Sequence, residues 1–439
     1  MEVMLQRVEQ YIKENRLLNR NELSLVALSG GADSVALLLI LLRLGYSVEA
    51  VHCNFHLRGT ESDRDENFAK ELCDKLSVKL HLIHFETKTY AETHQVSIEM
   101  AARQLRYRYF LQLAKDIGAK CVCVAHHQDD AVETLLINLL RGTGIHGLTG
   151  IRPRNGQVVR PLLCVSRTEI LEFLHDCSQD FMTDSTNLVP DVLRNKIRLQ
   201  LLPLMESICP AVRKNLLATA HNMEESEKIY NHTMQEWLGQ HVCNGTVSIE
   251  ALLRLPSPAS FLHEWLSPMG FTPAQTMQMT QCLNRKSGKV FSSATHEVLI
   301  DRNTILVQPK ESEMKSMSIP EPGNYRYKDD MIFCVDVRVG AHISKDNNCA
   351  SLNAGAILFP LTIRPAHVGD RFHPYGMEGS RLVSDYLTDL KLSLFDKRRQ
   401  LVVTDATGLI IWIVGHRTSH PCRVTPDVSN TLILKIIKE

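Results

Sequence analysis

The chain has 439 residues, more than one hydrophobic core usually spans, so its length predicts two or three domains. Hydrophobic residues make up 44% and charged residues 22% of it, ordinary values for a soluble globular protein, and no apolar run is long enough to cross a bilayer. Its 49 Lys and Arg balance its 49 Asp and Glu, so the formal net charge of zero gives no global indication of nucleic-acid binding. Any RNA would have to be held by local basic patches.

The first residues, MEVMLQRVEQYIKENRLL, place a charge every few positions among apolar residues at helical spacing. They lack the apolar core and the small-residue cleavage site of a secretory signal, so we expect a cytoplasmic protein with no membrane partner. The twelve cysteines are scattered and form no CxxC, which gives little support to a zinc site or an iron–sulfur cluster. Reduced and mostly buried thiols are the expectation.

The first half of the sequence alternates strand-like apolar runs with helix-like segments. The expected strands are 22–28, 47–54, 78–85 and 120–126, and the expected helices are 33–45, 61–76, 97–118 and 128–142. Strands separated by helices predict an α/β fold with a parallel, doubly wound sheet. Ligands of such sheets bind beyond the carboxyl ends of the strands, and LSGGADS, HCNFHLRG and AHHQDD all lie at such ends. Their shared position predicts one site.

The second half changes in texture from about Met205. Residues 205–240 are polar and helix-like, a β-hairpin is expected with its turn at Asp301–Asn303, and a polar linker follows at 309–323. Beyond the linker the chain is mainly strand-like, with one helix near RLVSDYLTDLK and an apolar strand at GLIIWIVG. The predicted domains are therefore a catalytic domain (1–204), a small, mostly helical middle domain (205–315) and an α+β C-terminal domain (316–439).

The segment LSGGADS has the features of an anion-binding loop. Its glycines let the backbone approach a phosphate, and the following helix supplies free N–H groups and the positive end of its dipole. Ser29 and Ser34 add hydroxyl donors, while Asp33 suits a phosphate site only through Mg²⁺ or by orienting the loop. The alternative is a plain turn in which Asp33 or Ser34 caps the helix.

SGGxDS after a first strand resembles the signature of the PP-loop ATP pyrophosphatases, which cleave ATP to AMP and pyrophosphate. Further motifs follow in order over residues 20–205: HCNFHLRG, ESDRDE, Arg103-Gln-Leu-Arg106-Tyr107, AHHQDDAVET, LLRGTGIHGLTGI and RPLL. Together they resemble the tRNA(Ile)-lysidine synthetase family, and TDSTN (183–187) and LRNKIR (193–198) extend the resemblance. The segments RPAHVGDRFHPYGMEGSRLVSDYLTDLK and IIWIVGHR resemble the last domain of that family, which helps to recognise the tRNA.

The resemblance implies a specific reaction. Free lysine would be joined to C2 of the wobble cytidine (position 34) in the CAU anticodon of tRNA(Ile), after ATP adenylates the base, with release of pyrophosphate and AMP. The implied cofactors are ATP and Mg²⁺, and the implied partners are L-lysine and that tRNA. Dimerisation occurs in parts of this family, so a homodimer is one expected state.

Two alternatives to this function stay open. Another PP-loop enzyme that modifies tRNA, such as a cytidine thiolase, usually needs paired cysteines for sulfur delivery, and the missing CxxC argues against it. A catalytically silent tRNA-binding protein would have no need of the intact Asp33, Arg106, Asp130 and Glu133.

The acidic and histidine candidates lie in AHHQDDAVET. Asp130 and Glu133 are one helical turn apart, so both carboxylates can face a lysine amine and one can take its proton. The alternative is a first helical turn enriched in acids for the dipole. His126 is the candidate that contacts the phosphate or the leaving AMP. Metal ligation by His126, His127, Asp129 and Asp130 is disfavoured, because adjacent residues rarely converge on one ion.

The basic candidates are spread over the chain. Glu99, Arg103 and Arg106 share one face of the expected helix at i, i+4 and i+7, and the alternative for this spacing is an exposed stripe of charges. The family pattern favours Arg106 as a ligand of the α-phosphate, and Arg198 gains by the same argument. The catalytic candidates are Asp33, Arg106, His126 and Arg198, and the ATP-binding candidates are Ser29, Gly30, Gly31, Ala32, Asp33 and Ser34. The tRNA-binding candidates are Arg58, Arg141, Arg194, Lys391, Arg398 and Arg399, against the alternative of a solvated basic surface. Phe55 and His56 stand where the family motif often has His and Gly, and adenine stacking is one hypothesis for Phe55.

Overall fold

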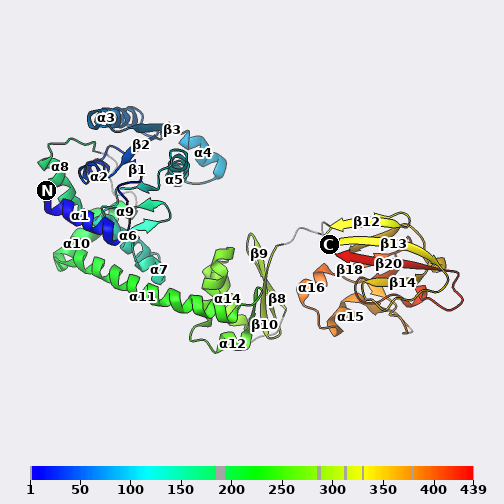
Figure 1. Ribbon diagram of the computed structural model, residues 1–439. Coiled ribbons are helices and arrows are strands. Elements are labelled where there is room, and N and C mark those ends of the chain that lie inside the picture. Colours follow the sequence, from blue (N-terminus) through cyan, green and yellow to red (C-terminus); the bar gives the residue numbers. More distant parts are fainter. Residues whose placement is uncertain are drawn as a thin grey trace. The chain divides into compact units, whose positions relative to one another are not determined.

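The structure is a computed structural model that describes residues 2–183, 193–283, 288–310, 314–328, 331–377 and 379–438. The chain forms two compact units, Met1–His232 and Thr233–Glu439, each of which has its own sheets and core (Figure 1). Most of the TDSTN motif, residues 184–187, lies outside the described residues. No helix in the described part of the chain is long and apolar enough to cross a membrane.

The first unit contains a six-stranded sheet in the order β3-β2-β1-β4-β6-β5. All neighbouring strands are parallel except β5, which runs antiparallel to β6 at one margin. This arrangement confirms the predicted parallel, doubly wound sheet. The strands are β1 (Ser24–Ala27), β2 (Val48–Asn54), β3 (Leu80–His84), β4 (Cys121–Cys123), β5 (Arg154–Asn155) and β6 (Val158–Val159).

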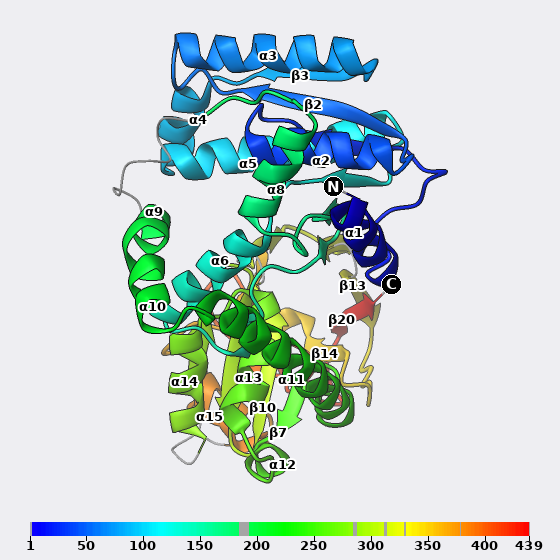
Figure 2. The ribbon, with the colours of Figure 1, turned by 90° about the vertical axis from the view of Figure 1, so that its left-hand side faces the viewer.

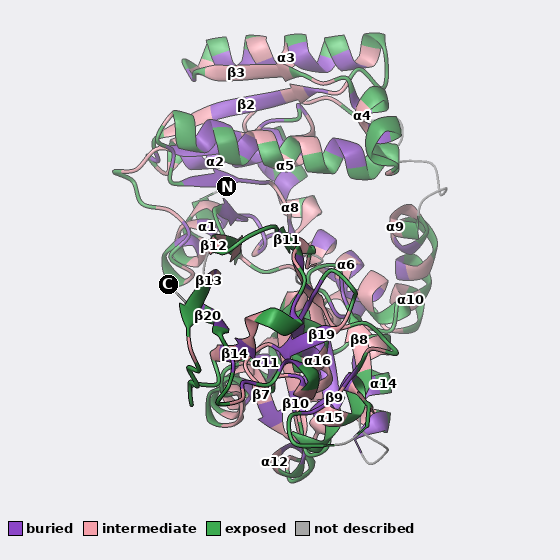
Figure 3. Cartoon of the chain, turned by 90° about the vertical axis from the view of Figure 1, so that its right-hand side faces the viewer, coloured by how far each residue is buried: buried purple, intermediate pink, exposed green. Residues whose placement is uncertain are grey.

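Helices cover both faces of this sheet because alternate strand residues point to opposite sides. Val26 packs into one core with α1, α2 and α8, whereas the adjacent Leu25 packs into a second core with α5. Helices α2, α3 and α5 run alongside the strands (Figure 2), and buried residues concentrate on β2 and α2 (Figure 3). The helices are α1 (Glu2–Glu14), α2 (Ala32–Arg43), α3 (Thr60–Leu76), α4 (Thr87–His94), α5 (Ile98–Asp116), α6 (Gln128–Leu140), α7 (Ile145–Leu148), α8 (Arg167–Asp176), α9 (Leu193–Lys196), the π-helical turn η2 (Ile197–Leu201), α10 (Leu202–Ile208) and α11 (Val212–His241), of which the residues from Thr233 onward belong to the second unit.

Helix boundaries in the first unit follow local capping. The Ser97 hydroxyl accepts a hydrogen bond from the amide of Met100 (3.2 Å) at the start of α5. At the start of α8, Ser166 and Glu169 form a reciprocal capping box. Helix α3 ends at Ser77, whose φ of 54° lies in the left-handed region. Neither α4 nor α8 is among the helices predicted from the sequence.

The described residues of the second unit form three four-stranded antiparallel sheets and a two-stranded sheet, β16-β17. The first, in the order β7-β10-β9-β8, packs against three short helices around a core that includes Phe261 and Val298. Its β9–β10 hairpin pairs Asp301 with Thr304 and so confirms the predicted turn. These elements are β7 (Thr246–Ser248), α12 (Ile249–Leu253), α13 (Pro258–Leu266), α14 (Pro273–Cys282), β8 (Lys289–Ser292), β9 (His296–Asp301) and β10 (Thr304–Pro309).

The other two four-stranded sheets have the orders β11-β15-β18-β19 and β12-β13-β20-β14. Their inward residues, among them Phe333, Val403 and Leu434, share one core. The predicted helix near residue 385 and the apolar strand near residue 411 are both present. The elements are β11 (Met317–Ile319), β12 (Gly323–Lys328), β13 (Met331–Val339), β14 (Cys349–Asn353), β15 (Leu361–Pro365), β16 (Arg371–Phe372), β17 (Arg381–Leu382), α15 (Val383–Asp389), α16 (Leu394–Arg399), β18 (Leu401–Thr404), β19 (Ile410–Ile413) and β20 (Asn430–Lys438).

Candidate functional site

The glycine loop connects β1 to α2 at the carboxyl edge of the first unit's sheet. Gly30 has a φ of 91°, which favours glycine, and its carbonyl accepts a hydrogen bond from the amide of Met182 (2.9 Å). The Ser34 hydroxyl donates to the carbonyl of Gly31 (2.9 Å) and accepts from the amide of Ser29 (3.1 Å). Gly31 is the N-cap of α2 and supplies no side-chain cap, so the first turn of the helix keeps N–H groups for an anion.

A pocket of about 280 Å³ opens at this edge, and we call it the edge pocket. Its lining includes Ser29, Gly31, Asp33 and Ser34 from the loop, Arg106 and Tyr107 from α5, Phe55 after β2, and His126 and Asp130 around the start of α6. The guanidinium of Arg106 lies 5.1 Å from the centre of the Phe55 ring, and that ring also stacks on Phe85 at 5.5 Å. The structure therefore brings the loop, Arg106, His126 and Asp130 together.

The ring of His126 is fixed by Arg160. The Arg160 Nε donates to Nδ1 of His126 (3.0 Å), and its Nη1 donates to the carbonyl of Arg152 (2.8 Å). Burial, together with the charge of Arg160, lowers the pKa of His126 to about 4, although Asp130 opposes this shift. A neutral ring that accepts at Nδ1 carries its proton on Nε2, so His126 offers the edge pocket a hydrogen-bond donor.

His127 lies behind the pocket at the centre of an acidic cluster. Its nitrogens lie 3.5 to 3.7 Å from carboxylate oxygens of Asp33, Asp129 and Asp130, and the residue is only 1% exposed. Burial favours the neutral ring, but the three carboxylates together raise the pKa of His127 above its usual value. When it is protonated, the ring of His127 neutralises part of the negative charge of these three carboxylates.

Asp33 and Asp129 are each held by arginines from distant segments. Arg167 donates its Nη1 to Asp33 Oδ2 (2.8 Å) and its backbone amide to Asp129 Oδ2 (2.8 Å). Arg213 of α11 donates to Asp129 Oδ1 (2.5 Å). Burial opposes the charge on Asp129, but His127 and the amide of Arg167 hold its pKa well below its usual value. Asp33 Oδ1 is buried without a hydrogen bond among the described residues.

The two acids of α6 contact arginines from the segment Leu193–Leu201. Arg198 donates its Nε and Nη2 to Glu133 (2.6 and 3.0 Å), and Arg194 donates its Nε to the same carboxylate (2.8 Å). Both guanidinium groups also lie 3.8 Å from Asp130 Oδ1. Glu133 is therefore engaged by guanidinium donors, whereas Asp130, whose Oδ2 accepts a hydrogen bond from the amide of His127 (3.1 Å), lines the edge pocket.

The remaining tRNA-binding candidates do not line the edge pocket. Arg58 contacts Asp65 (3.3 Å), and Arg141 is exposed at the end of α6. In the second unit, the carbonyl of Lys391 accepts from Arg302 (3.1 Å), Arg398 lies 3.6 Å from Glu297, and Arg399 hydrogen-bonds Gln308. The three candidates of the second unit therefore contact three different partners.

Three arginines of the site, Arg160, Arg167 and Arg213, were not among the residues predicted from the sequence, although Arg160 begins the motif RPLL. All three lie far along the chain from the side chains that they hold, and Arg167 is 134 positions from Asp33. A charged residue within an apolar stretch of sequence indicates a buried or paired charge, and this pattern in RPLL could have identified Arg160 as a residue of the site.

Family models match two parts of the chain: the PP-loop domain at residues 1–205 and the TilS substrate binding domain at residues 243–310. The glycine loop at the carboxyl edge of the parallel sheet and the first match define a PP-loop protein that uses ATP. The tRNA(Ile)-lysidine synthase of Bacteroides thetaiotaomicron is 44% identical over 98% of this chain and 99% of its own length. That of Parabacteroides distasonis is 42% identical over 99% and 100%, and that of Porphyromonas gingivalis strain W83 is 36% identical over 93% and 93%. The chain belongs to the tRNA(Ile)-lysidine synthase family.

Proposed function

We propose that this chain joins L-lysine to C2 of the wobble cytidine in the CAU anticodon of tRNA(Ile), with ATP as the activating substrate. The observation that carries the proposal is the edge pocket, which is lined at once by the glycine loop, Arg106, His126 and Asp130. A phosphate cradle, a cation, a neutral donor and an acid are the groups that adenylation followed by amine attack requires.

In the first step, the cytosine O2 attacks the α-phosphorus of ATP, the bond from that phosphorus to the bridging oxygen breaks, and pyrophosphate leaves. We assign the seat of pyrophosphate to Ser29–Ser34 and the N–H groups of the first turn of α2. Arg106 is the cation that faces the developing charge on the α-phosphate, and His126 Nε2 donates a hydrogen bond there. Holding base and ATP together contributes much of the rate.

In the second step, the ε-amine of lysine attacks C2, the C2–O2 bond breaks, and AMP leaves with that oxygen. Asp130 is placed to meet the amine first and to take its proton, because it faces the pocket. Glu133 can bind an ammonium group only after Arg194 or Arg198 gives way, since both now hold its carboxylate. When Arg198 releases Glu133, it moves toward the phosphate in our proposal.

Asp33 fits a role in holding Mg²⁺. Its Oδ1 is a hard oxygen ligand that is buried without a hydrogen bond among the described residues, next to the phosphate cradle. Bound there, Mg²⁺ would neutralise phosphate charge as pyrophosphate leaves.

The domains divide this work along the chain. We assign the catalytic domain to 1–204, the middle domain to 205–315 and the C-terminal tRNA-recognition domain to 316–439. The matched ranges 1–205 and 243–310 support the first two assignments. We place the protein in the cytoplasm, where its tRNA and lysine are found. A homodimer is the assembly that we would test first, by light scattering with and without tRNA.

The test is a reconstituted reaction. The full chain is incubated with ATP, Mg²⁺, labelled lysine and a tRNA(Ile) transcript with the CAU anticodon, and label in RNA, pyrophosphate and AMP are measured. One lysine incorporated for each AMP released is expected, and a transcript with uridine at position 34 is the matched control. If the RNA took up sulfur from a donor and never lysine, or if both transcripts were labelled equally, the proposal would be wrong.

A further inference from the structure

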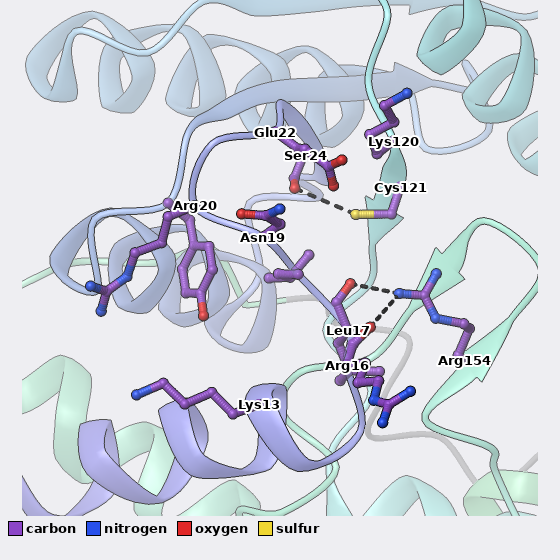
Figure 4. A pocket seen from close by; sticks show the side chains of 12 residues that line it. Lys13, Arg16, Leu17, Asn19, Arg20, Glu22, Ser24, Lys120, Cys121 and Arg154 are labelled. Carbon is purple, nitrogen blue, oxygen red and sulfur yellow. Dashed lines mark hydrogen bonds between the residues drawn. The ribbon is translucent and has the colours of Figure 1, made fainter.

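A hollow of about 620 Å³ lies at the opposite edge of the same sheet, where β1 and β4 begin. Its lining includes five cations from three segments of the chain and one acid, Glu22. The cations are Lys13, Arg16, Arg20, Lys120 and Arg154. We call these five residues the basic rim. Figure 4 shows their side chains around Ser24 and Cys121, which form the buried floor.

The rim carries charge that the protein does not neutralise. Glu9 pairs with Lys13 (2.8 Å) and with Arg20 (2.7 Å), so these two cations are partly compensated. Arg16 and Lys120 are exposed and have no acidic partner among the described residues. The chain as a whole has no net charge, so this excess is local.

The rim is also held in place by the backbone. Arg16 has a φ of 50°, in the left-handed region, and its carbonyl and that of Leu17 both accept from Nη2 of Arg154 (2.8 Å each). Figure 4 shows that both bonds use one nitrogen, which leaves the other terminal nitrogen of Arg154 available to an anion. A guanidinium that is fixed before binding loses little freedom when a phosphate arrives.

The residues that line the hollow favour a phosphate group over a nucleobase. The ring of Tyr46, an aromatic wall, already lies under the guanidinium of Arg20 at 5.8 Å from its centre, so a nucleobase gains no open face there. The long, exposed Lys and Arg side chains of the rim surround an uncharged floor. Side chains of this kind bind the phosphates of a nucleic-acid backbone and so position it. The family acts on an RNA, and a chain without net charge must meet RNA phosphates through local clusters of this kind.

We propose that the basic rim binds backbone phosphates of the tRNA substrate, on the edge of the sheet opposite the catalytic pocket. This inference rests on the proposed function for the identity of the RNA. It implies that the bound tRNA contacts the first unit at two edges, one through the wobble base and one through its backbone.

The test compares the full native chain with Arg16→Gln/Lys120→Gln, which removes the two uncompensated charges and keeps the backbone bonds of the rim. The matched control is Arg108→Gln/Lys115→Gln, which removes the same charge from exposed positions of α5. Filter binding of the tRNA(Ile) transcript is measured from low to high salt. We expect the rim variant to bind roughly five- to tenfold more weakly, with a slope of log K against log salt that is shallower by about 1.5. The control should keep the native slope.

Two outcomes would overturn the inference about the rim, and a third would show failure of the proposed function. Equal affinities and slopes for all three proteins would overturn the inference. Inorganic triphosphate is the probe for a small-anion site, and its binding is measured by calorimetry with the catalytic loop filled by a non-hydrolysable ATP analogue. If triphosphate bound to the native chain and lost its site in the rim variant while tRNA binding stayed native, the RNA assignment would be wrong. Failure of the proposed function would instead appear as absent lysine incorporation by the native chain, whatever the salt slopes.

Discussion

The two edges of the first unit's sheet treat charge in opposite ways. At the carboxyl edge, the carboxylates of Asp129 and Glu133 each receive guanidinium donors, and a buried histidine lies among the acids. At the opposite edge, Arg16 and Lys120 project into solvent without an acidic partner among the described residues. Paired and buried charge keeps a fixed geometry for chemistry, whereas exposed cations suit a polyanion that is held by many weak contacts.

This contrast gives each edge a different experimental signature. Substitutions at the carboxyl edge should change rate, substrate affinity or pH dependence, because they remove groups that line the edge pocket or hold its acids. Substitutions at the opposite edge should change RNA affinity and its salt dependence alone, because screening acts on exposed charge.

The largest effect is expected for Arg106→Gln. The guanidinium faces the edge pocket, and loss of one donor to developing charge typically lowers kcat by about 10²- to 10³-fold. Pyrophosphate release in a single turnover with saturating tRNA measures this. Arg108→Gln, an exposed arginine of the same helix, should retain the native rate. A native rate in Arg106→Gln would contradict the assignment of Arg106 to the α-phosphate.

Glu133→Gln should come next and should separate lysine use from nucleotide use. Hydrogen bonds to a charged group contribute about 1.5–3 kcal/mol, so the KM for lysine should rise roughly 10- to 100-fold while the KM for ATP stays native. Glu71→Gln, an exposed acid of α3, is the matched control. If pyrophosphate release fell as much as lysine incorporation, Glu133 would act through Arg194 and Arg198 on the nucleotide instead.

The adjacent histidines should give pH effects of opposite sign. The pKa of His126 is lowered to about 4 in the folded chain. As the pH falls from about 6.5, the unfolded chain therefore binds a proton at His126 that the folded chain does not bind. The free energy of unfolding decreases until about pH 4. This window corresponds to a loss of up to about 3 kcal/mol. His127 has a raised pKa, so its contribution is present below its unfolded pKa and is lost as pH rises through the folded value.

Urea unfolding at pH 5 and pH 8 measures the His126 effect. Gln keeps a donor near the position of Nε2 and does not titrate, so His126→Gln should lose less stability between pH 8 and pH 5 than the native chain. Other titrating groups are common to both proteins and cancel in the difference. An identical pH dependence of the two proteins would contradict a half-buried His126 that is neutral at these pH values.

The carboxyl edge could be predicted from the sequence better than the opposite edge, for a physical reason. Strand–loop–helix patterns are local, and the carboxyl ends of parallel strands meet at one edge, so the motifs LSGGADS and AHHQDD could be placed together from their positions after strands. Ser166 and Glu169 have the spacing of a capping box, which was a usable signal for α8. The eight-residue α4 has only two buried residues and gave no comparable pattern.

The partners of the site could not be predicted from local pattern. Arg213 reaches Asp129 across 84 positions, and periodicity within a helix carries no information about such a contact. The basic rim is similar, because Lys120 joins the other cations only when β4 pairs with β1 and places Cys121 beside Ser24. A single sequence shows cations at these positions and does not show that they meet.

The smallest effect is expected in the second unit. Lys391, Arg398 and Arg399 are close in sequence, yet Arg398 lies near Glu297 and Arg399 is bonded to Gln308. Arg398 would exchange Glu297 for a phosphate on binding, and Arg399 would exchange Gln308, so Lys391→Gln/Arg398→Gln/Arg399→Gln should weaken tRNA binding by only about twofold despite the loss of three charges. The same filter assay compares it with the rim variant. A larger loss than that of Arg16→Gln/Lys120→Gln would mean that these three cations contribute more to RNA binding than the basic rim does.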